Sequence, residues 1–262
     1  MKDITVIIPV LIDQLNTGEL ATAVKSVIDC QEYYTDGKLK VMIVRPSDSQ
    51  TDDPYFGDKI EIEYVYNDGK IDYCSQINFG VKHVDTEFFS ILEYDDYYNK
   101  KWFNMFNTYY NTNEDVSIFL PINVLHNAKT NEREFVNDAA WASSFSNEIG
   151  YLDFECLQAS ASFNLTGGIY KTSDWLGYKP SISVAFNYEY LLRATNKKQK
   201  VFVVPKEGYH HEIFRKGSLT QEYFDTINDD DNMKWFELAK REYAFDEDRN
   251  KGIINIKEDE LK

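Results

Sequence analysis

The chain has 262 residues, and its 28 Lys and Arg against 44 Asp and Glu give a formal net charge of −16 at pH 7. Hydrophobic residues make up 43% of the chain and aromatic ones 15%, which is enough for a substantial core and excludes a disordered chain. The acidic surplus makes nucleic acid an unexpected partner, because nonspecific binding to polyanions needs clustered Lys and Arg.

Targeting signals and covalent cross-links are not apparent in the sequence. No apolar run approaches the roughly 20 residues of a membrane span. The first apolar run follows no cationic stretch, so we expect no signal peptide. The three cysteines are odd in number and far apart, which is typical neither of a disulfide framework nor of a cysteine-rich zinc site. We therefore expect a soluble, cytoplasmic protein without a membrane span.

Strand-like and helix-like segments alternate in the first half of the chain. Apolar runs predict strands, and apolar faces with a period near 3.6 predict helices. In chain order we expect a strand at 4–10, a helix at 19–30, strands at 41–44 and 60–66, a helix at 71–84, a strand at 88–92 and a helix at 100–110. Helices between strands imply parallel pairing, so the predicted class is α/β with a mainly parallel sheet flanked by helices.

The second half is less regular, and no linker or repeat divides the chain. Its patterns predict strands at 116–122, 163–170 and 201–205, a helix at 184–195 and an amphipathic helix at 233–245 that packs on the body. From residue 225 onward there are 12 acidic and 7 basic residues, which indicates an acidic, helical C-terminal extension over 225–262.

Polar residues follow the predicted strands of the first half, at Asp13, 45–53, 67–70 and 93–96. In parallel sheets, ligands bind beyond the carboxyl ends of the strands. The sharpest of these segments carries Glu93, Asp95 and Asp96 within four residues. Such close like charges are tolerable in water or around a cation, and oxygen ligands suit Mg²⁺ or Mn²⁺. The alternative is an acidic helix start, where carboxylates complement the helix dipole.

The ordered motifs of residues 3–110 resemble those of the family 2 glycosyltransferases, which have the GT-A fold. They are Val6-Ile7-Ile8-Pro9-Val10, Ser26-Val27-Ile28-Asp29-Cys30-Gln31, Ser49-Gln50-Thr51-Asp52-Asp53, Asn67-Asp68-Gly69, Asn78-Phe79-Gly80 and Glu93-Tyr94-Asp95-Asp96. The second half is similar more loosely, through Thr166-Gly167-Gly168, the segment 186–193 and the segment 210–220.

This resemblance implies one Rossmann-like GT-A domain over 1–224, with a nucleotide- and metal-binding half (1–110) and an acceptor-binding half (111–224). It implies transfer of a sugar from a nucleotide-diphosphate sugar, most simply a UDP-sugar, to a glycan or other hydroxyl acceptor. The cofactor would be Mn²⁺ or Mg²⁺, and the anomeric configuration would invert.

The resemblance also assigns residues to the nucleotide and metal sites. The nucleotide would contact Pro9, Val10, Asp13, Arg45, Asp68, Asp72, Glu93 and Arg215, and the metal ligands would be Asp95, Asp96 and His211. Arg45 stands near the position of a family Asp pair, so either Arg45 or Asp48 in the longer loop would take over that contact.

The catalytic residues implied by the resemblance are Asn187 and Glu189. Asn187 stands where the family has its basic Asp, and an amide orients an acceptor but accepts no proton at neutral pH. Glu189 lies about 200° further round the helix, which leaves it either the base or an ordinary surface carboxylate. Further carboxylates near the expected acceptor side are Asp153, Glu155 and Asp174.

Three other functions fit parts of the pattern. Asn187 and Arg45 favour a degenerate protein that binds a nucleotide-sugar or glycan without turnover. A glycosyltransferase acting on modified nucleic-acid bases would need a basic groove, and basic residues concentrate only at 197–200 and 215–216. A nucleotidyltransferase also pairs an α/β sheet with metal-binding carboxylates.

Overall fold

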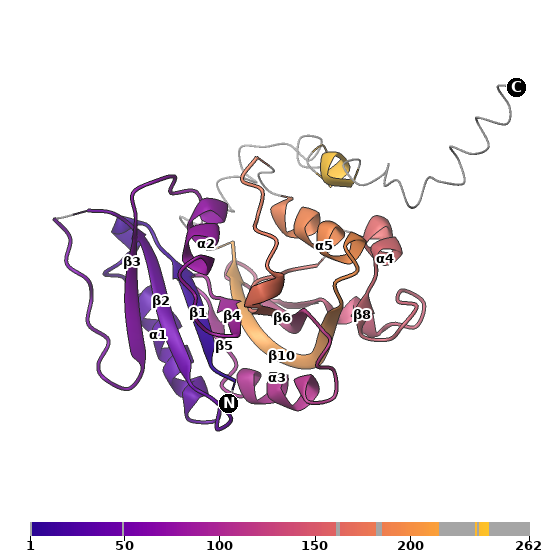
Figure 1. Ribbon diagram of the computed structural model, residues 1–262, viewed down its shortest axis with the longest axis horizontal. Coiled ribbons are helices and arrows are strands. Elements are labelled where there is room, and N and C mark those ends of the chain that lie inside the picture. Colours follow the sequence, from indigo (N-terminus) through magenta and orange to yellow (C-terminus); the bar gives the residue numbers. More distant parts are fainter. Residues whose placement is uncertain are drawn as a thin grey trace, which may run out of the picture.

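The computed structural model describes residues 2–48, 50–160, 163–181, 185–214, 234 and 236–240 (Figure 1). Its strands are β1 (Ile4–Pro9), β2 (Leu39–Pro46), β3 (Glu61–Asn67), β4 (Phe88–Ile91), β5 (Tyr97–Tyr98), β6 (Ile118–Asn127), β7 (Arg133–Val136), β8 (Tyr151–Leu152), β9 (Ile169–Lys171) and β10 (Val201–Ile213). Its α-helices are α1 (Gly18–Gln31), α2 (Tyr73–Val81), α3 (Trp102–Tyr110), α4 (Phe154–Ala159) and α5 (Phe186–Asn196).

The strands form one ten-stranded sheet in the order β3-β2-β1-β4-β9-β6-β10-β5, with β7 paired to β6 and β8 to β10. The four strands β3, β2, β1 and β4 are parallel, and so are β6 and β10. Strand β9 runs antiparallel between β4 and β6. The predicted α/β class with a mixed, mainly parallel sheet is therefore confirmed.

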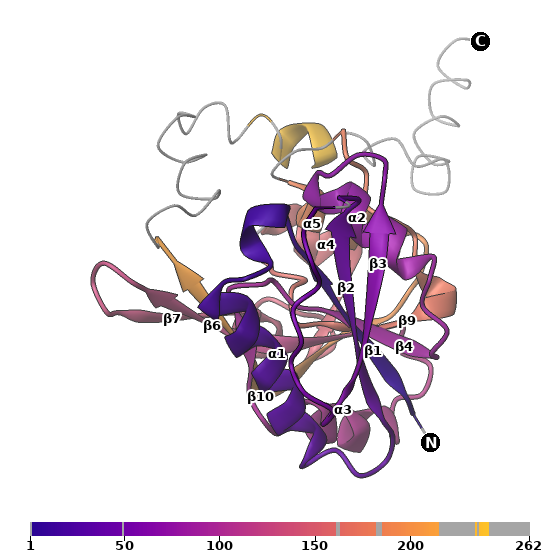
Figure 2. The same ribbon diagram turned by 90° about the vertical axis from the view of Figure 1, so that its left-hand side faces the viewer.

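Helices cover both faces of the sheet and create two cores. On one face, β1 and β2 bury Ile7 and Val44 in a cluster with side chains of α2, α4 and α5. On the other face, Ile8 and its alternating neighbours on β1 pack with α1 and α3. The two views agree, with α2, α4 and α5 on one side of the sheet and α1 and α3 on the other (Figures 1 and 2).

Local sequence accounts for the two helices that frame the N-terminal strands. Thr17 caps α1 by accepting a hydrogen bond from the amide of Leu20, and Asp72 caps α2 in the same way from Ser75. Gly80 lets α2 approach the sheet closely, because a Cβ there would lie 2.8 Å from Val44 Cγ2. This contact gives a packing reason for the Asn-x-Gly motif of this helix.

Two predicted strands have other boundaries in the structure. The strand expected at 163–170 begins only at Ile169, because Gly167 turns the chain with a φ of +75°. The strand expected at 201–205 continues to Ile213 as β10, with register shifts between Val203 and Tyr209. Such irregularities in the pairing re-aim side chains along a strand. Elements β5, β7, β8 and α4 have no counterpart among the predictions.

Little of the C-terminal extension lies within the described residues. Lys234 and residues 236–240 are helical, in agreement with the helix predicted at 233–245. Ala239 is buried, and the ring of Phe236 packs on Tyr188 of α5 with centroids 5.7 Å apart. The rest of 225–262 lies outside the described residues. In the part of the chain that is described, no helix combines the length and apolar character needed to cross a membrane.

Candidate functional site

Parallel pairing brings the ends of four strands to one edge of the sheet. Pro9 ends β1 and Val10 follows it, Arg45 lies near the end of β2, Asp68 follows β3, and the acidic segment 93–96 follows β4. Asp13 and Asp72 are exposed just beyond this edge, Asp13 in a short 3₁₀ helix after β1 and Asp72 as the cap of α2. The structure therefore gathers all the described residues that the sequence assigned to the nucleotide.

Strand β10 closes on the acidic segment from the other half of the chain. Tyr209 and Tyr98 are paired in the two-residue antiparallel ladder between β10 and β5. The Tyr209 hydroxyl donates to Asp96 Oδ2 at 2.7 Å and accepts a hydrogen bond from the Glu93 amide at 3.1 Å. The Glu212 amide donates to Asp96 Oδ1 at 3.2 Å. The Asp96 side chain is thereby fully buried and fixed in orientation.

Glu93, Asp96 and His211 form a three-residue group whose ligand atoms all lie within 4.8 Å of one another. Two carboxylates and an imidazole fit Mn²⁺ or Mg²⁺ in donor type, the imidazole favouring Mn²⁺. His211 Nδ1 lies 2.6 Å from Asp96 Oδ2, which leaves Nε2 as the nitrogen available to a metal ion. Of the three residues expected as ligands, Asp96 and His211 are in this group. Glu93, which was assigned to the nucleotide, takes the third place instead of Asp95.

The electrostatics of this group reflect like charges held close together, with Asp96 buried and Glu93 half-buried. Burial, followed by the neighbouring Asp96 charge, raises the pKa of Glu93 to about 8. Burial opposes protonation of His211, but the carboxylates of Asp96, Glu93 and Asp95 together raise its pKa to about 9. Asp95 thus acts on the group through its charge. A divalent cation would relieve the repulsion that these shifts express.

Arg45 is engaged by its own loop. Its guanidinium is 1% exposed, pairs with Asp53 at 2.6 Å and donates to the backbone carbonyls of Asp48 and Thr51. Arg45 therefore holds Asp48, Thr51 and Asp53 in place at the sheet edge. Asp48 accepts hydrogen bonds from Thr51 and from the Gln50 amide, which lower its pKa.

Helix α5 begins beside the same edge. The ring of Phe186, its first residue, lies 5.4 Å from the ring of Tyr73 at the start of α2 and 5.0 Å from that of Tyr178. Asn187 accepts a hydrogen bond from the Tyr178 hydroxyl at 3.4 Å. Burial and then the Glu93 charge raise the pKa of Tyr73, so Tyr73, which contacts Phe186, is also within electrostatic reach of the acidic group.

Glu189 is fully buried, so its interpretation as an ordinary surface carboxylate is wrong. Its carboxylate lies 2.9 Å from Arg193 and 3.2 Å from Lys179. Arg193 also donates to the carbonyls of Leu176 and Gly177. Glu189 therefore ties α5 to the loop that carries Lys179.

Two of the other candidate bases lie at the opposite edge. Asp174 follows β9, which runs antiparallel to β4 and so ends at the amino edge of the sheet, and there it accepts a hydrogen bond from Ser117. Asp153 follows β8, which pairs with the first residues of β10, and it caps α4. Glu155 lies in the first turn of the same helix. These three carboxylates belong to the predicted acceptor-binding half of the sequence, but they do not lie near the Glu93–Asp96–His211 group.

Tyr209 is the residue of this site that sequence reasoning missed. The sequence did hold a signal for it. Side chains alternate between the two faces of a strand, so Tyr209 lies on the same face as His211, two residues further on. That signal was hidden because the strand was expected to end at residue 205. Gly167 belongs to the same arrangement, since a Cβ there would lie 2.4 Å from the Tyr209 ring. Arg215 lies outside the described residues.

The mixed sheet and its flanking helices define a class of fold: this is the GT-A fold, which nucleotide-sugar glycosyltransferases have. Among solved structures, the chain is similar to S. aureus TarS, a GT-A glycosyltransferase. Against TarS 1–349 with UDP-GlcNAc, the TM-score is 0.63 at 12% identity, covering 91% of this chain and 65% of that one. Against the structure of TarS 1–349 alone, the TM-score is 0.58 at 14% identity, covering 81% of this chain and 60% of that one.

At these identities the similarity establishes the fold. The sequence matches no family profile and no curated protein sequence. The chain spans less than two thirds of the length of the TarS chains that it matches.

Proposed function

We propose that this protein transfers a sugar from a UDP-sugar to a hydroxyl group of an acceptor, with Mn²⁺ or Mg²⁺ as cofactor and with inversion, as a family 2-like glycosyltransferase. The observation that carries the proposal is the Glu93–Asp96–His211 group at the carboxyl edge of a GT-A sheet. Structures of TarS with UDP and with UDP-GlcNAc support the choice of donor.

The residues of the edge have distinct tasks in this proposal. Glu93, Asp96 and His211 would hold the metal, which when bound neutralises the diphosphate and stabilises it as a leaving group. Tyr209 orients Asp96 by its hydrogen bond. The ends of β1, β2 and β3 line the place of the nucleotide, with Arg45 fixing the loop after β2.

Transfer itself is a displacement at the anomeric carbon. The acceptor oxygen forms the new bond, the bond to the diphosphate breaks, and the acceptor proton passes to a base. Glu189, on the helix that starts at this edge, is the carboxylate proposed as that base, and Asn187 on the first turn of the same helix would orient the acceptor. A single displacement inverts the configuration.

The test is to incubate the protein with a panel of UDP-, GDP- and TDP-sugars, with and without Mn²⁺, and to measure turnover as release of the nucleotide. We expect metal-dependent release of UDP from at least one UDP-sugar, and the product's anomeric configuration reports inversion. Release that is equally fast in EDTA would contradict the metal site.

A second candidate is a protein that binds the nucleotide-sugar without transferring it. The specific observation in its favour is that the Glu189 carboxylate already forms ion pairs with two cations, Arg193 and Lys179. Mn²⁺-dependent UDP binding measured by calorimetry, together with no turnover across the panel, would favour this candidate over transfer.

A further inference from the structure

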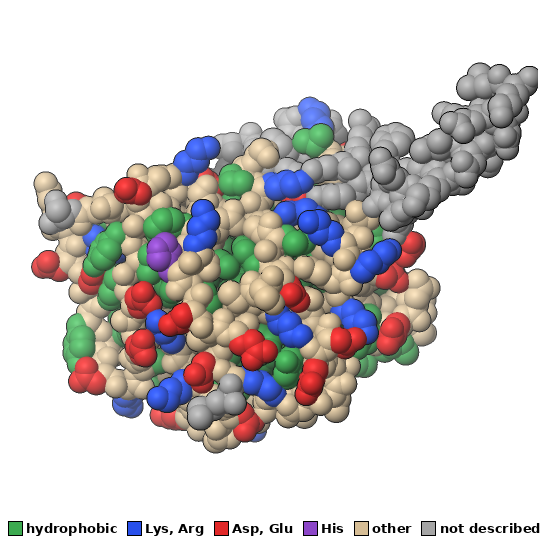
Figure 3. Space-filling model, viewed as in Figure 1, with side chains coloured by type: hydrophobic (Ala, Val, Ile, Leu, Met, Phe, Trp, Pro, Cys, Tyr) green, Lys and Arg blue, Asp and Glu red, His purple; other side chains and the backbone are tan. Residues whose placement is uncertain are grey.

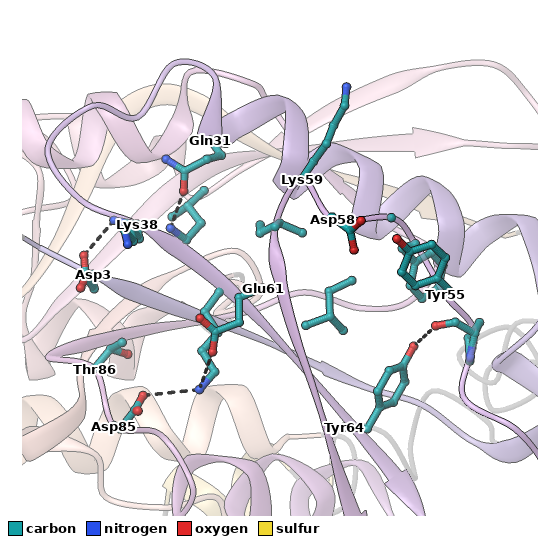
Figure 4. Close-up of a pocket in the computed structure, with 17 residues that line it drawn as sticks. Asp3, Gln31, Lys38, Tyr55, Asp58, Lys59, Glu61, Tyr64, Asp85 and Thr86 are labelled. Atoms are coloured by element: carbon teal, nitrogen blue, oxygen red, sulfur yellow. Dashed lines mark hydrogen bonds and ion pairs between the residues drawn. The ribbon is translucent and has the colours of Figure 1, made fainter.

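A cavity of about 870 Å³ lies at the amino edge of the sheet, opposite the Glu93–Asp96–His211 group (Figure 4). Its walls come from the starts of neighbouring strands: Asp3 precedes β1, Lys38 precedes β2, Glu61 begins β3, and Asp85 precedes β4. Strands of six to eight residues separate the two edges, a distance of about 20 Å. The volume lies in the usual range of ligand pockets, about 300–1,000 Å³.

The cavity exists because of the connection between β2 and β3. Parallel strands are usually joined by a helix that covers the sheet. In the described part of this connection, residues 47–48 and 50–60, no helix forms. The loop instead crosses the sheet face, held by a hydrogen bond from Tyr64 to the carbonyl of Pro54. Ile62 and Tyr64 on β3 are therefore only partly buried and form an apolar floor.

The two ends of the cavity differ in character. Tyr55 and Tyr64 lie at one end, and Asp3, Lys38 and Asp85 lie at the other (Figure 4). The Tyr55 side chain is 76% exposed, and its hydroxyl is hydrogen-bonded to Asp58. An aromatic surface at one end and hydrogen-bonding groups at the other suit a ligand with apolar faces and many hydroxyl groups.

Charge excludes other ligand classes. Four acidic and three basic side chains line the cavity. One of the basic ones, Lys40, is already paired with Glu61, Glu63 and Asp85. A phosphate or nucleotide needs a surplus of unpaired cations, which this lining does not provide. The charged rim is equally unsuited to a lipid chain.

We propose that this cavity is a binding site for an uncharged oligosaccharide. A sugar ring would pack its C–H face on Tyr55 and Tyr64, and its hydroxyls would bond to Asp58 and to the charged side chains of the rim. The site is separate from the edge proposed to bind the nucleotide-sugar, and the proposal stands whether or not the protein is a transferase.

The test is calorimetric titration of the full chain with maltotetraose, cellotetraose and N-acetylchitotetraose. We expect one of them to bind, and Tyr55→Ala to weaken that binding at least about fivefold. Phe135→Ala, a matched change of an aromatic residue that is 51% exposed on β7, should leave it unchanged. Binding should also persist in Asp96→Asn and in the presence of UDP with Mn²⁺, which separates this site from the nucleotide edge.

Failure of all three oligosaccharides to bind at millimolar concentration would overturn the proposal. So would binding that Tyr55→Ala leaves intact, or binding that UDP with Mn²⁺ displaces. Because Tyr55 is exposed, loss of binding in Tyr55→Ala is not expected to come from unfolding, and an unchanged melting temperature checks this.

Discussion

Asp96 and Asp95 are adjacent carboxylates with different surroundings. Asp96 is buried and receives hydrogen bonds from Tyr209 and Glu212, whereas Asp95 is half-buried and acts on the group through its charge. A side chain fixed in this way can serve as a metal ligand at low entropic cost. The sequence alone made the two look equivalent, since both follow the same strand.

We predict that Asp96→Asn weakens Mn²⁺ binding by about 100-fold, because it removes one of the charges that offset the cation. Asp95→Asn should weaken binding far less. Titration of both variants with Mn²⁺ measures the difference, and circular dichroism checks that they are folded. Equal losses in the two variants would show that the ligand set is wrong.

Tyr209→Phe removes the hydroxyl that links Asp96 to the Glu93 amide. We expect a loss of about 1–3 kcal/mol in the free energy of unfolding and about tenfold in Mn²⁺ affinity. Tyr98→Phe is the matched control, because the Tyr98 hydroxyl bonds to Ser90 and Ile91 and not to the acidic group. If Tyr98→Phe lowers Mn²⁺ affinity as much as Tyr209→Phe does, the assigned role of Tyr209 is wrong.

At the scale of elements, the packing of α2 on the sheet depends on Gly80. Gly80→Ala should destabilise the protein by about 1–3 kcal/mol, because the new Cβ meets Val44 and Ile7, and the strain outweighs the gain of about 1 kcal/mol in helix propensity. Gly18→Ala, at the start of α1 with nothing within 4 Å, should be neutral or stabilising. Urea unfolding measures both, and a stabilised Gly80→Ala would refute the close contact.

The ion pairs of Glu189 fix α5 to the loop 176–179. Glu189→Gln leaves Arg193 without its buried partner, so we expect a loss of about 3–5 kcal/mol in the free energy of unfolding. Asp29→Asn breaks the exposed pair of Lys25 and Asp29 and should change stability little. Similar melting temperatures for Glu189→Gln and the unaltered protein would show that these pairs contribute nothing.

The N-terminal elements were predictable because each has a pattern of its own. The apolar run of β1 predicts a strand directly, and the apolar stripe of α1 at Leu20, Val24 and Val27 predicts a helix. Short strands such as β5 and β8 carry no such pattern, since two residues form no period. They exist because β10 pairs with them.

The site was predictable to the extent that it follows strand ends. Glu93 and Asp96 could be found because they come directly after β4. Their contact with Tyr209 and His211 depends on the register shifts of β10, which are set by tertiary packing and not by local sequence. The burial of Glu189 has the same origin, because its partner Lys179 comes from a different segment.

For the whole molecule, the surplus of 16 negative charges has two parts. On the face drawn in Figure 3, acidic and basic side chains are intermingled over the surface. The acids of the Glu93–Asp96–His211 group, of which Asp96 is buried and Glu93 half-buried, are a separate part, which a cation would stabilise.

We therefore predict that Mn²⁺ raises the melting temperature of the whole protein. A ligand at 100 times its Kd stabilises the folded state by about 2.7 kcal/mol, which corresponds to about 5 °C or more. EDTA should reverse the shift, and Asp96→Asn should not show it. An equal shift in Asp96→Asn would place the cation elsewhere.

The pair of His211 and Asp96 joins residues 115 positions apart in the chain. During synthesis, the acidic segment leaves the ribosome long before the strand that covers it, and contacts of such long range form late in folding. Binding of a cation to this group would therefore require that β10 has been synthesised and has joined the sheet. A chain that ended before β10 would carry the carboxylates without the imidazole, so it would lack the complete set of ligands.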